Sequence, residues 1–318
     1  MQDNANNNPE SWIGRSETRH DTISAAPVAA LGATLDHTAA EVTAGMPLPP
    51  LWHWLYFLPM HRQSEIGPDG HPRRGGFLPP IALPRRMWAG SQLEFRSSIR
   101  IGDRVTRTST IDDVKTKEGR TGPLIFVKVR HEICCNDAAE PALVEFHDIV
   151  YREAQRTDET SSPSPSPVMQ PASADATWQR EVVPDEVLLF RYSALTFNGH
   201  RIHYDRSYVT DVEGYPGLIV HGPLIATLLL DLLWRERPEA DVAAFSFKAV
   251  RPTFDLHSFR LNGEPQADGK SIRLWATDHE GFLTMEATVV LRSKLKGSVL
   301  RYDAPLKAVG DDDWEALV

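Results

Sequence analysis

The sequence predicts an α+β fold in which an antiparallel sheet curls around a buried helix. Both halves of the chain contain successive runs of alternating apolar and polar residues, which is typical of antiparallel strands with one covered face. Residues 221–235 are apolar nearly all round, as in a helix that is buried on every side. A stretch of Ser, Pro and small polar residues at 154–177 lies between the halves and predicts a linker.

The composition suits roughly two soluble domains, with 318 residues of which 41% are hydrophobic and 24% charged. The net charge of −9 argues against a nucleic-acid partner, which would normally meet a basic surface. The adjacent Cys134 and Cys135 match neither Cys-x-x-Cys nor a secreted disulfide framework, and they indicate thiols in a reducing compartment. The first residues lack a signal peptide pattern, and no apolar run is long enough to cross a membrane. We therefore expect a cytoplasmic protein.

The predicted first domain spans residues 11–153 and starts with helical sequence after a loose tail at 1–20. Residues 21–45 are rich in Ala and Leu with apolar spacings of three and four, and Asp21 is a candidate cap. We expect one helix here, or two short ones separated near Pro27.

The rest of this domain combines irregular chain with strands. The aromatic and proline-rich residues 46–59 are expected to line the core as irregular or strand-like chain, and the Gly- and Pro-rich residues 61–87 to form a loop. Alternating patterns predict the strands, at 93–101, 103–115, 124–135 and 142–152.

The predicted second domain spans residues 178–300 and repeats the order of helices followed by strands. An extended segment leads to a short helix begun by Pro184-Asp185, and a second short helix is expected near 205–212. The long helix at 221–235 follows. Four alternating runs predict the closing strands, at 242–250, 257–264, 271–278 and 282–293.

Three polar residues, Asn198, His200 and His203, lie shortly before the start of the long helix. Pro223 fits the first helical position and has no N–H, so the amide of Gly222 is the best-placed donor to a ligand oxygen. A helix N-terminus stabilises an oxyanion and a nearby imidazole moves protons, a pairing that suits chemistry on a carbonyl group. The alternative is that Gly222 serves only as a capping glycine.

The histidines His200, His203 and His221 also raise the question of a metal site. Their spacing lacks the usual helix-borne His-x-x-x-His arrangement with a carboxylate or Cys partner. We therefore expect no metal.

Two stretches of the chain resemble a known family. FNGHRIH at 197–203 followed by GLIVHGPL at 217–224 resembles the signature of MaoC-type (R)-specific enoyl-thioester hydratases and the related type 2 hydroxyacyl-thioester dehydratases. LPRRMWAG at 83–90, with the segments around it, is similar to the amino-terminal domain of the double hot-dog members. The resemblance covers residues 11–300 and implies a double hot-dog fold, in which two antiparallel sheets are each wrapped around a central helix.

The resemblance implies a role for each matched residue. The family pattern Asp-x-Asn-Pro-x-His ends on His203, implied as the main acid–base group, and begins on Asn198. An amide in the place of the Asp can orient water but cannot accept its proton. The His-Gly of the pattern falls on His221 and Gly222, where the helix start would receive the thioester carbonyl. His221 and His200, which stands in the place of the family's Asn, are candidates for contact with the substrate.

Arginines are candidates for binding the phosphates of coenzyme A or a second carboxylate on the acyl group, because a guanidinium binds oxyanions in a bidentate manner. Arg85 and Arg86 are the better candidates because they lie within LPRRMWAG, whereas Arg73, Arg74 and Arg251 are weaker ones. The alternative for each arginine is a surface ion pair with one of the 43 acidic residues.

The resemblance implies an enzyme that reversibly hydrates an α,β-unsaturated acyl-CoA without a cofactor, since CoA is part of the substrate. Within the family, the likeness is to the hydratases of branched C5 dicarboxylyl-CoA esters such as mesaconyl-C4-CoA or itaconyl-CoA. The second domain would carry the chemistry, and the first would accommodate the acyl chain and CoA.

Other functions stay open at this point. A straight-chain 3-hydroxyacyl-thioester dehydratase would use the same residues on a thioester of CoA or acyl carrier protein. A hot-dog acyl-CoA thioesterase would need a carboxylate on or beside the central helix, where Asp231 is available. A non-catalytic acyl-CoA-binding protein is the third option. The sequence leaves the oligomeric state open, with a homodimer as one option.

Overall fold

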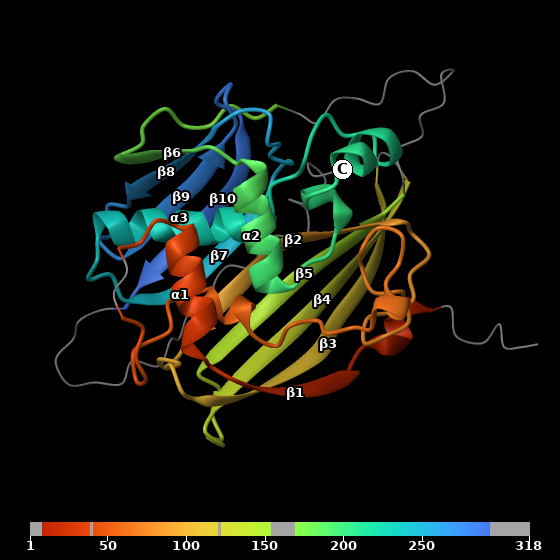
Figure 1. The fold of residues 1–318 in the computed structure, drawn as a ribbon, viewed down its shortest axis with the longest axis horizontal. Coiled ribbons are helices and arrows are strands. Elements are labelled where there is room, and N and C mark those ends of the chain that lie inside the picture. The colour runs from red at the N-terminus through yellow and green to blue at the C-terminus, as the bar shows by residue number, and fades with distance from the viewer. Residues whose placement is uncertain (1–7, 39–40, 120–121, 154–168, 293–318) are drawn as a thin grey trace, which may run out of the picture.

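The computed structural model describes residues 8–38, 41–119, 122–153 and 169–292 (Figure 1). The first half of the chain contributes the strands β1 (Ser16–Thr22), β2 (Arg85–Phe95), β3 (Arg104–Gly119), β4 (Gly122–Cys135) and β5 (Leu143–Arg152). The second half contributes β6 (Trp178–Val182), β7 (Val242–Ala249), β8 (Phe259–Pro265), β9 (Ser271–Thr277) and β10 (Leu283–Leu291). Within these described ranges all ten strands form one antiparallel sheet, in the order β1-β3-β4-β5-β2-β7-β10-β9-β8-β6.

The two halves of this sheet meet where β2 pairs with β7, from Gly90 opposite Lys248 to Glu94 opposite Ala244. Each half therefore supplies five consecutive strands of the sheet. The predicted pair of antiparallel sheets is confirmed, and the two sheets continue into one another instead of packing as separate layers.

The main helices are α1 (Ala25–Thr34), α2 (Glu186–Thr196) and α3 (Gly222–Glu236), and Figure 1 shows them together on one side of the sheet. Short helical turns complete the described structure, at Pro9–Trp12, Trp52–Leu55, Gln63–Glu65, Arg201–His203 and Tyr208–Val212, the last of them π-helical.

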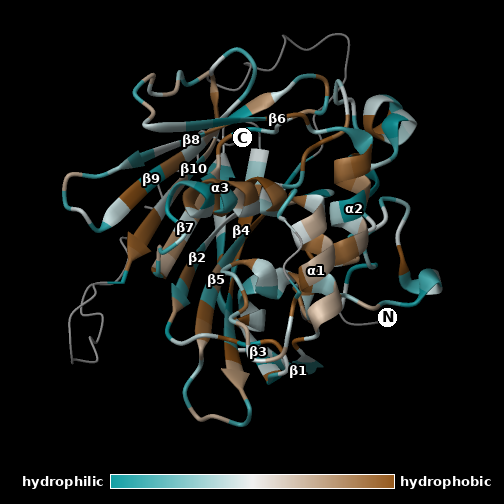
Figure 2. Ribbon diagram, turned by 60° about the vertical axis from the view of Figure 1, so that its left-hand side comes forward, coloured by the Kyte–Doolittle hydropathy of each residue, from teal (hydrophilic) through white to brown (hydrophobic). Residues whose placement is uncertain are grey.

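Helix α3 is the core of the second half, as its sequence predicted. Every residue from Leu224 to Leu233 is buried, and Figure 2 shows α3 as a largely hydrophobic helix lying across the strands. The helix makes its contacts with β6, β8, β9 and β10. Because an apolar helix of this length exposes surface on all sides, the sheet has to wrap around it to remove that surface from water.

The first half is filled differently, because its described residues contain no helix as long as α3. The irregular segment 46–59 lines the core there, as predicted, with Leu51, Trp52, Leu55 and Phe57 all buried. These side chains belong to the same continuous hydrophobic core as the buried residues of α3.

Most strands and helices of the chain agree with their predictions, whereas its first residues and the start of β2 do not. Residues 16–22 form the edge strand β1 against β3, although 16–20 were expected in a loose tail and Asp21 and Thr22 at the start of a helix. Helix α1 begins after Ser24 and not at Asp21, whose carboxylate accepts the N–H of Phe57 at 2.7 Å. Strand β2 begins at Arg85, eight residues before the predicted start at Leu93 (93 − 85 = 8).

Much of the predicted linker, and residues 293–318, lie outside the described residues. The described end of the linker runs beside the second half of the sheet, where Leu283 donates to the carbonyl of Gln170 and Ala172 donates to that of Gly281. No helix in the described part of the chain is long and apolar enough to cross a membrane.

Candidate active site

The chain after α2 is held in a tight turn that places the predicted catalytic residues. Phe197 ends the helix with a φ of 50°, a left-handed conformation that redirects the chain. The N–H of Asn198 donates to the carbonyl of Ser193 at 2.8 Å, and its side-chain Oδ1 accepts the N–H of His200 at 3.0 Å. Because this oxygen is committed to the turn, the amide N–H groups of Asn198 are left to donate to water or a substrate.

His203 is a buried imidazole with a defined tautomer. Its Nδ1 lies 2.7 Å from the carbonyl oxygen of Ile219, and a carbonyl only accepts, so Nδ1 carries the proton. The lone pair is therefore on Nε2. Burial, the largest cause, lowers the pKa of His203 to about 4 and keeps the ring neutral near pH 7. A neutral imidazole with a free Nε2 lone pair is a general base.

His221 stacks on His203 and caps α3. The two ring centroids are 3.7 Å apart with an angle of 18° between the planes. Nε2 of His221 shares a hydrogen bond with the hydroxyl of Ser193 at 2.8 Å, while its buried Nδ1 has no partner among the described residues. An unpartnered buried nitrogen is costly, and at the start of a helix it marks a position where a ligand can complete the hydrogen bonding.

Gly222 has no conformational need to be glycine, because its φ is not positive. A Cβ at this position would meet only Met285, at 3.9 Å, and no hydrogen bond within the described residues uses the Gly222 N–H. A capping role therefore does not explain the glycine, whereas close approach of a ligand to a free helix N-terminal amide does.

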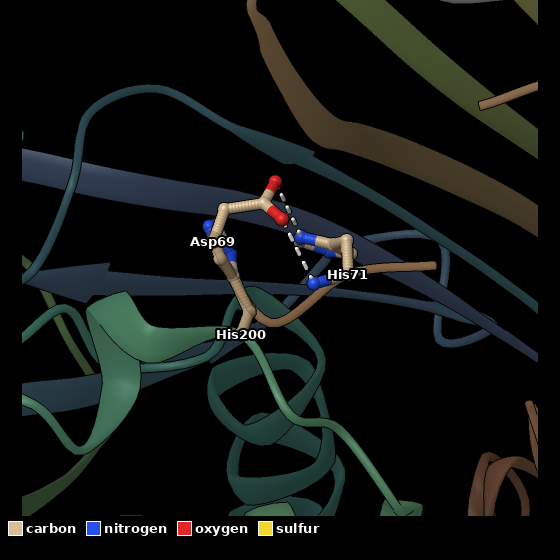
Figure 3. Close-up of side chains that lie close together, drawn as sticks. All are labelled: Asp69, His71 and His200. Carbon is tan, nitrogen blue, oxygen red and sulfur yellow. Dashed lines mark hydrogen bonds and ion pairs between the residues drawn. The ribbon is translucent and has the colours of Figure 1, made fainter. Parts of the chain in front are cut away.

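A loop of the first half closes this site from the other side (Figure 3). Gly70 packs directly on Gly199, so closely that a Cβ at Gly70 would clash with the Gly199 carbonyl. This contact brings His71 beside His200, with ring centroids 4.0 Å apart. The carboxylate of Asp69 accepts the backbone N–H of His71 at 3.0 Å, and its other oxygen lies 3.5 Å from the His71 Nδ1.

Asp69, His71 and His200 form a cluster of one carboxylate and two imidazoles, and the pKa values of all three are lowered. Burial, followed by the charges of His71 and His203, lowers the pKa of His200 to about 2, and burial also lowers the pKa of His71. Burial opposes ionisation of Asp69, but hydrogen bonds from His71 and the charges of His71 and His200 hold its pKa well below its usual range. The cluster at neutral pH therefore consists of uncharged imidazoles beside an ionised carboxylate.

The residues that could hold a metal ion in this structure differ from the three histidines considered in the sequence. His203 and His221 lie face to face, so their in-plane lone pairs do not converge on one ion. Asp69, His71 and His200 are the residues whose ligand atoms all lie within 4.8 Å of one another. The Asp69 carboxylate accepts the backbone N–H of His71 and lies 3.5 Å from its Nδ1. The expectation that the protein holds no metal stays a prediction.

The candidate arginines differ in whether their guanidinium groups are already engaged within the protein. Arg85 donates to the Tyr215 hydroxyl at 3.2 Å and to the Glu213 carbonyl at 2.9 Å, and it also pairs with the Glu213 carboxylate at 3.5 Å. Arg251 lies 3.2 Å from the carboxylate of Asp278. Both are engaged in holding segments together. The weaker candidate Arg74 donates to the carbonyls of Ile81 and Pro84, whereas the side chain of Arg73 is exposed.

Arg86 is the candidate that faces the histidines. Its charge contributes to lowering the pKa of His71 and of His200, after burial and other groups. Arg86 lies opposite Tyr151 in the pairing of β2 with β5, and within the described residues its guanidinium forms no ion pair with a carboxylate. Arg86 is therefore positioned to meet an anionic part of a ligand at this site.

Asp231, the carboxylate on which a thioesterase would depend, is committed elsewhere. It is fully buried and pairs with His37 at 2.5 Å, Arg180 at 2.5 Å and Arg235 at 2.8 Å. A carboxylate held by two arginines and a histidine has no free oxygen with which to activate water.

Acidification is expected to destabilise the fold, because buried histidines must take up protons on unfolding. Burial is the largest cause that lowers the pKa of His131 to about 3 and those of His147 and His203 to about 4. The unfolded chain protonates them near pH 6.5, so their stabilising contribution is present above about pH 6.5 and is lost as the pH falls through about 4. The urea midpoint should fall steadily over this window. A constant midpoint down to about pH 5 would contradict the burial of these rings.

Comparison with known proteins identifies the family and the fold of the chain. Residues 51–255 match the family described as hydroxyacyl-thioester dehydratase type 2. The chain is 48% identical over 285 residues to a mesaconyl-C(4)-CoA hydratase of Chloroflexus aurantiacus, covering 88% of this chain and 96% of that protein.

Solved structures share the fold at low sequence identity. A MaoC-like dehydratase of Phytophthora capsici superposes with a TM-score of 0.63 at 12% identity, covering 90% of this chain and 97% of that one. A Mycobacterium tuberculosis protein described as having a double hotdog fold superposes with a TM-score of 0.52 at 13% identity, covering 88% of this chain and 96% of that one. The predicted double hot-dog fold is confirmed by these similarities.

Proposed function

The chain belongs to the hydroxyacyl-thioester dehydratase type 2 family, and from this premise we propose that it reversibly adds water to the double bond of a branched C5 dicarboxylyl-CoA. Mesaconyl-C4-CoA is the first candidate because a relative at 48% identity carries the name of its hydratase, and itaconyl-CoA is the second. The observation that carries the proposal is the free Nε2 lone pair of the buried His203 beside the unused N–H of Gly222.

The reaction follows from these groups. The thioester oxygen accepts the N–H of Gly222, and the amide N–H of Asn198 donates to the attacking water. As the water oxygen bonds to Cβ, Nε2 of His203 takes its proton, and the π electrons move onto the thioester oxygen as an enolate. The imidazolium of His203 then returns the proton to Cα. One water has been added, and the enzyme is unchanged.

Asp69 supplies the negative charge that an amide at position 198 cannot. The proton taken from water makes a cation within a cluster of neutral imidazoles, and Asp69 is an ionised carboxylate in that cluster. In this proposal, Asp69 is a positioning residue that acts through His71 and His200 on the charge of the cluster.

Replacing Asp69 with asparagine is expected to lower kcat about tenfold, if the carboxylate is worth about one pKa unit to the imidazolium. Asparagine preserves the shape and still accepts the His71 N–H. The acid limb of the kcat profile should also shift to lower pH, because a less stabilised imidazolium has a lower pKa. Glu65→Gln, in the same loop, is the control and should leave both unchanged. An unshifted pH profile in Asp69→Asn would refute this role.

An absorbance screen tests the proposed function. The purified protein is mixed with mesaconyl-C4-CoA, itaconyl-CoA and crotonyl-CoA, and the loss of conjugated enoyl-thioester absorbance is followed. We expect the fastest loss with one of the two dicarboxylyl esters. Faster hydration of crotonyl-CoA would favour the straight-chain alternative, and no loss with any ester would reject hydration.

A further inference from the structure

The inner face of the first half carries an unusual row of polar side chains. In the pairing of β2 with β5, Arg86 lies opposite Tyr151 and Ser91 lies opposite His147. Tyr151 and His147 are four residues apart on one strand and therefore share a face. The register shift between Trp88 and Gly90 brings Arg86 and Ser91 onto that same face of β2, although they are five residues apart.

His147 has an open hydrogen-bonding position within this face. Its ring lies against Trp88, with centroids 4.1 Å apart, and its buried Nε2 has no partner among the described residues. Burial, the largest cause, lowers the pKa of His147 to about 4, so the ring is neutral near pH 7 and one nitrogen can donate. A buried nitrogen without a partner is rare in native proteins and indicates a place for a ligand atom.

Arg86 lies between this face and the reaction centre. Its charge contributes to lowering the pKa of His147 as well as those of His71 and His200, and it lies opposite Tyr151 in the pairing of β2 with β5. The neighbouring Arg85 is already paired with Glu213, whereas Arg86 has no carboxylate partner within the described residues. A half-buried guanidinium without a counter-ion, flanked by neutral donors, is suited to one carboxylate.

We propose that Arg86, with Tyr151 and His147, binds the free carboxylate of the acyl group and thereby selects dicarboxylyl over neutral enoyl thioesters. This inference rests on the proposed hydration. A thioester whose carbonyl meets Gly222 and whose double bond lies beside His203 extends its acyl end past His200, toward Arg86. The carboxylate completes the ion pair of Arg86 and accepts a hydrogen bond from the open nitrogen of His147.

The test compares two substrates in matched variants. Arg86→Gln is expected to lower kcat/KM about 100-fold for mesaconyl-C4-CoA, because a charged hydrogen-bonded pair is lost, and only a few-fold for crotonyl-CoA, which has no second carboxylate. Arg86→Lys, which retains the charge but not the planar fork, should lie between. His147→Gln should cause a smaller loss that is again confined to the dicarboxylyl ester. Arg73→Gln, an exposed arginine of the preceding loop, is the control.

The outcomes distinguish a failure of the proposed carboxylate site from a failure of the proposed function. The proposed carboxylate site would be wrong if Arg86→Gln and Arg86→Lys lowered kcat/KM equally for both esters while thermal unfolding stayed unchanged. Arg86 would then bind the CoA phosphates or support the site. A weaker inhibition by free CoA in Arg86→Gln would identify the phosphates and also overturn the proposed carboxylate site. If the unaltered protein hydrated crotonyl-CoA but not mesaconyl-C4-CoA, the dicarboxylyl substrate itself would be wrong.

Discussion

Replacing His203 with alanine is expected to lower kcat for hydration about 10³-fold, within the range of removing a general base. In the proposed mechanism the variant loses the Nε2 lone pair that takes the proton from water, whereas Gly222 and Asn198, which are proposed to hold the thioester and the water, are unchanged. KM should therefore change much less than kcat. Stopped-flow absorbance with mesaconyl-C4-CoA measures both.

The control for this variant is His61→Ala, which removes an exposed histidine from the loop that also carries His71. Its kcat should equal that of the unaltered protein. Because His203 packs on His221, the far-UV circular dichroism and the urea midpoint of His203→Ala have to be compared as well. A folded His203→Ala protein with near-normal hydration would remove His203 from the chemistry.

Replacing Asp231 with alanine is expected to lower the free energy of unfolding by about 2 kcal/mol, because a buried carboxylate that accepts charged hydrogen bonds is lost, while its partly exposed cationic partners can turn to water. The carboxylate is fully buried between Arg180, Arg235 and His37. Urea unfolding measures the loss. Asp241→Ala breaks an ion pair with Arg292 whose side chains are 57% and 42% exposed, and this control should cost no more than about 1 kcal/mol.

A second substitution of Asp231 distinguishes a hydratase from a thioesterase. Asp231→Asn is expected to weaken the fold without selectively affecting turnover, because Asp231 lies nine residues after Gly222 (231 − 222 = 9) and is already paired. A stable Asp231→Asn protein that had lost only thioester cleavage would instead support a thioesterase.

The elements predicted from sequence are those whose signals are local. Helix α3 was predicted because its apolar run is continuous, and the closing strands were predicted because their side chains alternate. The edge strand β1 was missed because SETRHDT has no apolar residue, and the strand with which it pairs, β3, is far away in the chain. Residues Asn198 to Gly222 could be grouped because they are close in sequence.

Asp69 and His71 could not be predicted as part of the site. They reach His200 through the contact of Gly70 with Gly199, and no local pattern reports a contact between loops so far apart in sequence. Arg85 and Arg86 could be singled out but not told apart. Adjacent residues of a strand point to opposite faces, and the sequence does not reveal which face lines the site.

The most direct test of the hydration proposal is product analysis after mixing the purified protein with mesaconyl-C4-CoA. The enoyl-thioester absorbance, the free thiol and the mass of the product are measured in the same sample. The account predicts loss of the absorbance, a product heavier by one water with CoA still attached, and no free thiol. Release of free CoA thiol in step with the loss of absorbance, or tight binding with unchanged absorbance, would contradict it.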